Sequence, residues 1–200
     1  MKDKKVIPTT GSSTVSVYPL TPDRWADLDT LFGEHGSGGG CWCMWWRLTD
    51  EQYRKQAGQA NKRAFKKIVN SGEAPGVLVY VGKQPAGWCS IAPREQFGRL
   101  ERSPLLKRVD DKPVWSIVCY YVDRLFRGQG LMEHLTRGAI ELAIDRGARI
   151  IEAYPFEISE NFSASQAYTG TVPLMRELGF VEVLRRASDR PIMRYYVDEH

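Results

Sequence analysis

The chain has 200 residues, of which 42% are hydrophobic and 26% are charged, a balance typical of a folded globular protein and not of a disordered one. Its 28 basic and 24 acidic residues give a net charge of +4, and the basic residues lie in short scattered clusters, which argues against nucleic acid as a partner. The sequence contains no apolar run of the roughly 18 residues that a membrane span needs and no secretory signal, so we expect a cytoplasmic protein with no membrane partner.

The first predicted elements are a polar tail, a strand and a helix. Residues 1–12 are expected to form a flexible tail, and residues 13–198 a single domain. Alternating valines predict a strand over residues 13–20. Thr21 followed by Pro22 is typical of a helix start.

A glycine-rich and aromatic segment separates this helix from the next one. The run 36–40 contains four glycines and ends the first helix, and three tryptophans follow within residues 41–46. Thr49 and Gln52 have the spacing of a capping box, which predicts a second helix running to about Asn70. The basic residues of this helix are expected to form a solvated face.

The second half of the chain predicts strands alternating with helices. Strands are expected over residues 76–81, 86–92, 113–122, 148–156, 180–184 and 191–197, with helices over 130–146 and 171–178. The first two of these strands are close enough to form a hairpin, and the nearly continuous apolar run at 113–122 is typical of a central strand. The order of elements predicts an α/β fold built on a mixed sheet.

The four cysteines do not have the pattern of a disulfide framework. Cys41 and Cys43 have only one residue between them, whereas structural zinc sites prefer two to four. Cys89 and Cys119 lie singly in apolar runs. We therefore expect buried, unreactive thiols and no bound metal.

The segment 122–132 carries the clearest functional signal. A buried strand ends at Val122, a short loop holds an arginine and two glycines, and a long helix begins. Such a junction presents unpaired backbone N–H groups and the positive end of a helix dipole, which together bind phosphate or pyrophosphate. The segment is not a P-loop, and Glu133 stands where a dinucleotide-binding fingerprint needs its third glycine.

The loop Arg127-Gly-Gln-Gly-Leu-Met132 resembles the acetyl-CoA pyrophosphate loop of the GNAT superfamily of N-acyltransferases, R/Q-x-x-G-x-G/A. The elements after it, including Gly179-Phe180, resemble the closing half of that fold, and the resemblance covers residues 13–197. It implies a mostly antiparallel central sheet flanked by helices, with a V-shaped splay between the two central strands, and acetyl-CoA as cosubstrate. Met132 departs from the family's Gly or Ala.

The resemblance also implies which residues bind the cosubstrate and which group stabilises the reacting carbonyl. The implied cofactor-binding residues are Tyr120, Tyr121, Val122, Arg127, Gly128, Gln129, Gly130, Leu131 and Met132. The N–H of Val122 would polarise the thioester carbonyl. Family members often have a tyrosine acid where this chain has Met175. No metal and no covalent enzyme intermediate are implied.

An amine acceptor needs a proton acceptor, because an alkyl amine is mostly cationic at neutral pH. The candidate catalytic residues are Glu152, Tyr154 on the same face of one strand, and Tyr168. Glu152 is equally compatible with a salt bridge to an arginine, and Tyr154 with core packing.

The aromatic segment between the first two helices lies where the family often has part of its acceptor site. Trp42, Trp45 and Trp46 are the candidate substrate residues, either holding an amine by cation–π contact or packing in the core. The sequence thus predicts an acetyl-CoA-dependent N-acetyltransferase acting on a primary amine of a small molecule or peptide. A non-catalytic acyl-CoA-binding sensor on the same fold is the alternative, and a homodimer is left open.

Overall fold

The computed structural model describes residues 7–8, 14–159 and 166–199. Its strands form one sheet in the order β1-β2-β3-β4-β5-β6-β8-β7. The pairs are antiparallel except for β5 and β6, which are parallel. This arrangement confirms the predicted α/β fold with a mixed, mostly antiparallel sheet. Most of the predicted tail lies outside the described residues, and the domain limits at residues 13 and 198 stay predictions.

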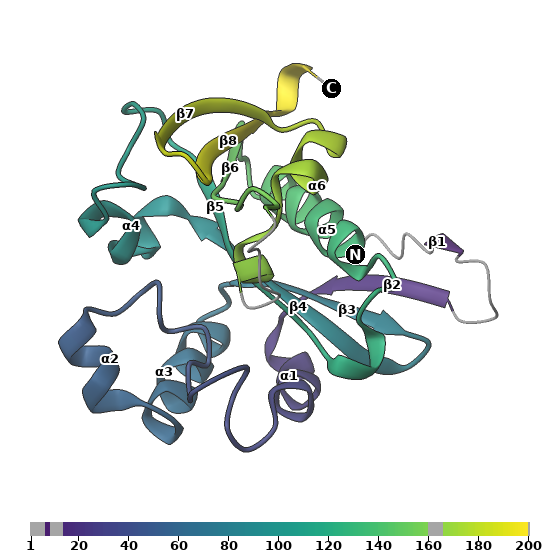
Figure 1. Ribbon diagram of the computed structural model, residues 1–200. Coiled ribbons are helices and arrows are strands. Elements are labelled where there is room, and N and C mark those ends of the chain that lie inside the picture. The colour runs from purple at the N-terminus through teal and green to yellow at the C-terminus, as the bar shows by residue number, and fades with distance from the viewer. Residues whose placement is uncertain (1–6, 9–13, 160–165, 200) are drawn as a thin grey trace.

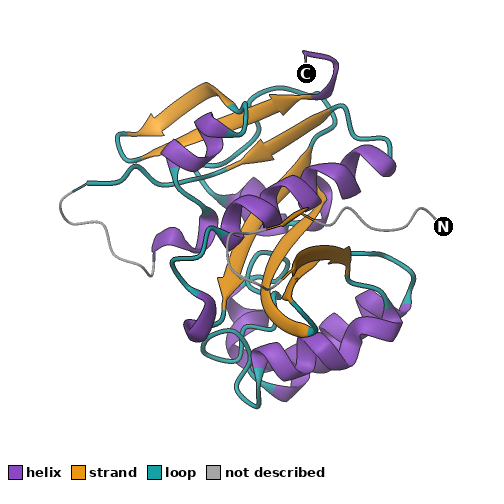
Figure 2. Ribbon diagram, turned by 90° about the vertical axis from the view of Figure 1, so that its right-hand side faces the viewer, coloured by secondary structure: helices purple, strands orange, loops and turns teal. Residues whose placement is uncertain are grey.

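The strands are β1 (Ile7–Pro8), β2 (Thr14–Pro19), β3 (Gly76–Val81), β4 (Gln84–Pro93), β5 (Trp115–Val122), β6 (Ile150–Ala153), β7 (Val181–Ala187) and β8 (Arg190–Tyr196). The α-helices are α1 (Trp25–Phe32), α2 (Asp50–Gln56), α3 (Gln59–Asn70), α4 (Gly98–Arg102), α5 (Leu131–Asp145) and α6 (Val172–Glu177). Helices α1, α2 and α3 gather on one side of the sheet and α5 lies on the other (Figure 1). Figure 2, turned by 90°, again has helices on both sides of the strands.

Both faces of the sheet are buried because successive residues of a strand point in opposite directions. Val77 and Val79 of β3 belong to the apolar cluster beneath α5. Leu78, between them, and Trp88 of β4 belong to the cluster that includes residues of α1 and α3. Among the described helices, none combines the length and the apolar character needed to cross a bilayer.

The predicted second helix is wrong as a single element. Thr49 and Gln52 do form the capping box that begins α2, but the helix stops at Gln56 and α3 starts at Gln59. Gly58 takes a φ of +74°, and its N–H donates to the carbonyl of Gly40 at 3.1 Å. A glycine adopts this conformation easily, and the hydrogen bond to a distant loop replaces the one that would have continued the helix.

The strand predicted over residues 148–156 is shorter than expected. Strand β6 ends at Ala153, two residues before Pro155, which has no N–H to donate to a sheet. Phe156 forms an isolated bridge with Thr171 instead. The parallel pairing of β5 with β6 is therefore short, joining Trp115, Ser116 and Ile117 to residues 151–153.

A buried ion network lies at this short pairing. The Glu152 carboxylate accepts hydrogen bonds from Arg94 Nη1 and Arg194 Nε, both at 2.9 Å. Tyr154 Oη donates to the same carboxylate at 2.7 Å, accepts from Arg94 Nη1 at 2.7 Å and lies 2.8 Å from Ser116 Oγ. Glu152 and Arg94 are each only 1% exposed. Each buried charge therefore has a charged partner, which burial in a low-dielectric interior requires.

The network continues toward the surface through two further carboxylates. Arg94 Nε donates to Glu101 at 2.8 Å, and Arg194 makes a two-pronged contact with Asp110 at 2.7 and 2.9 Å. The hydrogen bonds from Arg194 lower the pKa of Asp110 to about 2. The network thus joins β6 and β8 to the segment around α4.

Replacing Glu152 by glutamine is expected to lower the free energy of unfolding by about 3 kcal/mol, because two buried arginines lose their shared counter-charge. Urea denaturation of Glu152→Gln measures this loss. Glu177→Gln, an exposed change on α6, is the matched control and should leave the midpoint unchanged. A Glu152→Gln protein as stable as the parent would contradict the structural role.

Helix α5 packs closely on β2 at Gly138, where an added Cβ would overlap the Val17 side chain. Gly138→Ala is expected to destabilise the fold by about 1–2 kcal/mol, because overpacking outweighs the gain of about 1 kcal/mol in helix propensity. Denaturation of a Gly138→Ala/Val17→Ala double variant is the check. The double variant should lose less stability than the two single changes added together, and simple additivity would speak against the contact.

Candidate functional site

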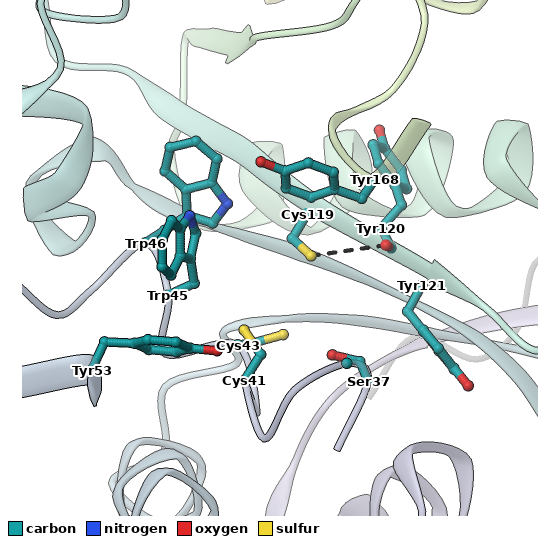
Figure 3. Close-up of a pocket in the computed structure, with 11 residues that line it drawn as sticks. Ser37, Cys41, Cys43, Trp45, Trp46, Tyr53, Cys119, Tyr120, Tyr121 and Tyr168 are labelled. Carbon is teal, nitrogen blue, oxygen red and sulfur yellow. Dashed lines mark hydrogen bonds between the residues drawn. The ribbon is translucent and has the colours of Figure 1, made fainter. Parts of the chain in front are cut away.

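Two cavities meet beside the C-terminal half of β5. The first, of about 280 Å³, is lined by Ser37, Gly38, Cys41, Cys43, Trp45, Trp46, Tyr53, Cys119, Tyr120, Tyr121 and Tyr168 (Figure 3). The second, of about 600 Å³, is lined by Ser37, Gly38, Tyr120, Tyr121, Val122, Arg127, Met132, Ala167 and Tyr168. The five residues common to both lists are Ser37, Gly38, Tyr120, Tyr121 and Tyr168. The cavities are therefore adjoining parts of one site, which we call the acceptor pocket (the first) and the loop channel (the second).

The end of β5 presents a backbone N–H to the site. Asp123 donates its N–H to the carbonyl of Ala86 at 3.0 Å, so Val122 and Gly87, which face each other across β4 and β5, form a non-hydrogen-bonded pair. In such a pair the N–H points away from the partner strand. Because β6 has ended by this level of the sheet, the N–H of Val122 faces the side where no strand continues.

The loop between β5 and α5 has the geometry of an anion site. Gly130, the residue before α5, adopts a left-handed conformation with φ of +73° and ψ of +7°, and Gly128 has a φ of +76°. The first-turn N–H groups of α5 have no partner earlier in the helix. Arg127 Nε donates to the Val122 carbonyl at 3.1 Å, which holds the loop against the strand end.

The glycine-rich segment forms the opposite side of the site. The carbonyl of Gly40 accepts from Gly58 N–H at 3.1 Å and from Asn61 Nδ2 at 2.9 Å. This docking on the α2–α3 junction needs glycine, because a Cβ at Gly40 would overlap the backbone of Gly58. Trp42 and Cys43 then take φ values of +45° and +55°, a strained conformation for side chains of this kind that is often found at functional sites.

The predicted cofactor-binding residues fall into two groups. Five of them line the loop channel: Tyr120, Tyr121, Val122, Arg127 and Met132. The other four, Gly128, Gln129, Gly130 and Leu131, belong to the loop and first turn but are not among its lining residues. Their proposed contacts would be through backbone N–H groups.

The three predicted substrate tryptophans do not lie together. Trp45 and Trp46 line the acceptor pocket. Trp42 is fully buried, with its ring centroid 6.1 Å from that of Trp25 and 5.5 Å from that of Phe32. It packs in the core between α1 and α3, the alternative that the sequence left open.

The three predicted catalytic residues are also separated. Tyr168 lines both cavities. Glu152 and Tyr154 lie in the buried ion network instead, and neither lines the acceptor pocket or the loop channel. For Glu152 the salt-bridge alternative is the one present in the structure.

The sequence-based prediction missed several lining residues, namely Ser37, Gly38, Cys41, Cys43, Tyr53 and Cys119. Cys41 and Cys119 are only partly buried, contrary to expectation, whereas Cys43 and Cys89 are buried as expected. The available signal was strand alternation, because Cys119 lies two residues before Tyr121, which was predicted to bind the cofactor. Among the described residues, no three His, Cys, Asp or Glu side chains are grouped to hold a metal ion.

Burial keeps three polar groups of the acceptor pocket neutral at pH 7, namely those of Tyr168, Tyr53 and Cys43. Burial raises the pKa of Tyr168, with Arg190 acting in the opposite direction, and burial raises the pKa of Tyr53 to about 12. The pKa of the Cys43 thiol is also raised well above its usual value by burial. Tyr168 therefore carries its proton, and its position between the two cavities lets it give that proton to a group bound there.

Solved structures share the fold at low sequence identity. A GNAT-family acetyltransferase from Listeria monocytogenes 4b F2365 is 14% identical, with a TM-score of 0.57 over 96% of this chain and 100% of its own. The putative acetyltransferase yncA from Salmonella typhimurium, solved with its cofactor acetyl-CoA, is 17% identical, with a TM-score of 0.51 over 93% and 95%. A Streptococcus agalactiae 2603 GNAT acetyltransferase is 12% identical, with a TM-score of 0.53 over 91% and 95%.

A comparison with curated proteins gives no match. The model of the acetyltransferase (GNAT) family, however, matches residues 42–180, which span the aromatic segment, the loop after β5 and Phe180. With this match over more than half of its length, the chain belongs to the GNAT acetyltransferase family.

Proposed function

We propose that this protein is an acetyl-CoA-dependent N-acetyltransferase that acetylates a primary amine of a small molecule or peptide. The observation that carries the proposal is the junction of the two cavities at Tyr120, Tyr121 and Tyr168. A phosphate-binding loop at one end and a pocket at the other suit a long cosubstrate with its reactive group far from its phosphates.

The residues of the loop channel fit acetyl-CoA. Arg127 and the first-turn N–H groups of α5 supply the positive charge and donors that a pyrophosphate needs. The edge of β5 beyond Ile117, where β6 no longer pairs, is the proposed V-shaped opening for the pantetheine arm, which can hydrogen-bond to the exposed strand edge.

Two groups are proposed to act on the thioester. The N–H of Val122, directed away from β4, polarises the carbonyl and stabilises negative charge on its oxygen during attack by the amine. Tyr168 donates its phenolic proton to the departing thiolate. Glu152 and Tyr154 are proposed to hold the strands around the site and not to transfer protons, since both already bind buried partners.

One observation favours the alternative of a non-catalytic acyl-CoA sensor. Met175, at the position where the family often has its acid, is fully buried, and a Cβ at Gly170 would lie 2.6 Å from Met175 Cε. A methionine side chain has no acidic proton, so Met175 cannot serve as the acid. Incubation with acetyl-CoA and a panel of amines, followed by chromatography of released CoA, separates the two functions, because a sensor would bind acetyl-CoA without releasing CoA in the presence of any amine.

Arg127→Glu is expected to raise the Kd for acetyl-CoA at least about tenfold, which is about 1.4 kcal/mol, because a cation beside the phosphates becomes an anion. Calorimetric titration measures the change. Arg146→Glu, at the exposed C-terminal end of the same helix, is the matched control for the charge reversal. Equal affinities for the two variants would argue against pyrophosphate binding at this loop.

Tyr168→Phe is expected to lower kcat about 100-fold while leaving the Kd for acetyl-CoA unchanged, because the phenol acts on the leaving group and not on binding. Steady-state kinetics and calorimetry on the same preparation test both parts. Tyr18→Phe, on β2 and outside both cavities, is the control. A Tyr168→Phe enzyme with the parent kcat would remove Tyr168 from the mechanism.

A further inference from the structure

Two arginines stand against the tryptophans of the acceptor pocket. The Arg99 guanidinium lies 3.6 Å from the centroid of the Trp45 ring, and that of Arg190 lies 5.8 Å from the centroid of Trp46. Neither arginine is among the residues that line the pocket. Arg99 is held in place by Asp50 at 2.7 Å and by the Trp45 carbonyl at 2.8 Å.

These contacts change what the tryptophans can bind. The negative face of an indole attracts a cation, but here each ring already has a protein cation beside it. A second cation in the pocket would meet a ring that already attracts a guanidinium. The positive charge of that guanidinium would also repel it. The pocket therefore disfavours the binding of a charged ammonium group.

The other walls supply no compensating charge. The described residues that line the acceptor pocket include no aspartate or glutamate. Burial raises the pKa of Tyr53 and Tyr168, so that their phenols stay neutral. An ammonium ion moved from water into these surroundings would lose its hydration without gaining a counter-ion.

We propose that the acceptor is a weakly basic aromatic amine, which enters as the neutral base with its ring against Trp45, Trp46 and Tyr53. This inference rests on the proposed function and names the substrate class of the same site. Trp45 and Tyr53 already pack edge to face, with ring centroids 4.9 Å apart, and aromatic pairs of this kind add to the stability of burial. A cavity of about 150 Å³ accommodates benzene, so the acceptor pocket of about 280 Å³ has room for one ring beside an acetyl group.

A neutral acceptor also balances the proton inventory of the reaction. The amine nitrogen attacks the thioester carbon with its lone pair, the C–N bond forms and the C–S bond breaks. The nitrogen loses one proton and the sulfur gains one. Tyr168, which lines both cavities, is the group proposed to donate to sulfur and to be reprotonated from nitrogen. The products are the N-aryl acetamide and CoA, and no separate base is needed to deprotonate an ammonium ion.

Matched amine pairs test the inference, with CoA release followed by chromatography. Aniline and 4-methoxyaniline have conjugate-acid pKa values of roughly 4 to 5, near that of a glutamate, whereas benzylamine and 4-methoxybenzylamine are mostly cationic at pH 7. The aryl amines should have a kcat/KM at least about tenfold higher at pH 7. The kcat/KM of the aryl amines should not change between about pH 6.5 and 8.5, because these amines are already neutral. Over the same range the kcat/KM of the benzylamines should rise about tenfold per pH unit, as their neutral fraction does.

Each other outcome is decisive. Faster turnover of the benzylamines at pH 7, or turnover of peptide amines alone, overturns the inference and leaves the proposed function in place. Binding of acetyl-CoA with no turnover of any amine overturns both.

Adding a carboxylate to the pocket provides a second test. Ser37→Asp should lower the ratio of aniline to benzylamine turnover at least about tenfold, because the carboxylate both attracts an ammonium ion and can accept its proton before the neutral amine attacks. Gly38→Asp is the backup if that variant does not fold, since a Cβ at Gly38 meets nothing within 4 Å. Ser71→Asp, at the exposed end of α3, is the control. A folded pocket variant with the parent ratio would contradict selection by charge.

Discussion

The buried carboxylate of Glu152 is the contact on which the site depends. It lies between Arg94 and Arg194 at the level where β5 and β6 are still paired, and above this level only β5 continues. A buried ion pair adds little net stability compared with apolar packing, but it strongly disfavours arrangements that leave one partner alone. The network therefore keeps β6 and β8 in register beside β5, at the point where the pairing of β5 with β6 ends.

Beside the end of β5 that β6 leaves unpaired, two distant parts of the chain line the site. The loop after β5 supplies N–H groups and Arg127, and the segment from Ser37 to Trp46 supplies the wall of the acceptor pocket (Figure 3). The second part has no regular structure of its own and is held by the hydrogen bonds of Gly40 to the α2–α3 junction. The left-handed conformations of Trp42 and Cys43 direct one side chain into the core and the other into the pocket.

The buried charges lie in the ion network, and the walls of the acceptor pocket are neutral. The fully buried carboxylate of Glu152 belongs to the ion network that joins the strands. The described pocket walls, in contrast, consist of aromatic rings, thiols and neutral hydroxyls. Arg99 and Arg190 lie against the tryptophan rings of the pocket, and Arg190 also acts on Tyr168. In such surroundings the Tyr168 phenol keeps its proton at pH 7, because burial raises its pKa.

The sequence by itself determined the features that depend on neighbouring residues. The capping box at Thr49, the glycine turn before α5 and the family resemblance of the Arg127–Met132 loop are all local patterns, in which the backbone groups and the side chains that satisfy them lie within a few positions. For the same reason the strands from β2 to β8 were found, although their ends shifted by a few residues, whereas β1 lies within the residues expected to form a tail.

Only the tertiary structure decided which side chains meet. Glu152 had the same sequence context whether it was a base or an ion-pair partner, and the choice was made by Arg94 and Arg194, which are 58 and 42 positions away. Trp42 and Trp45 are three residues apart, yet one is in the core and the other in the pocket. The break between α2 and α3 likewise required Gly40 as an acceptor. Long-range contacts of this kind depend on how the strands and loops pack, and no local pattern of residues records them.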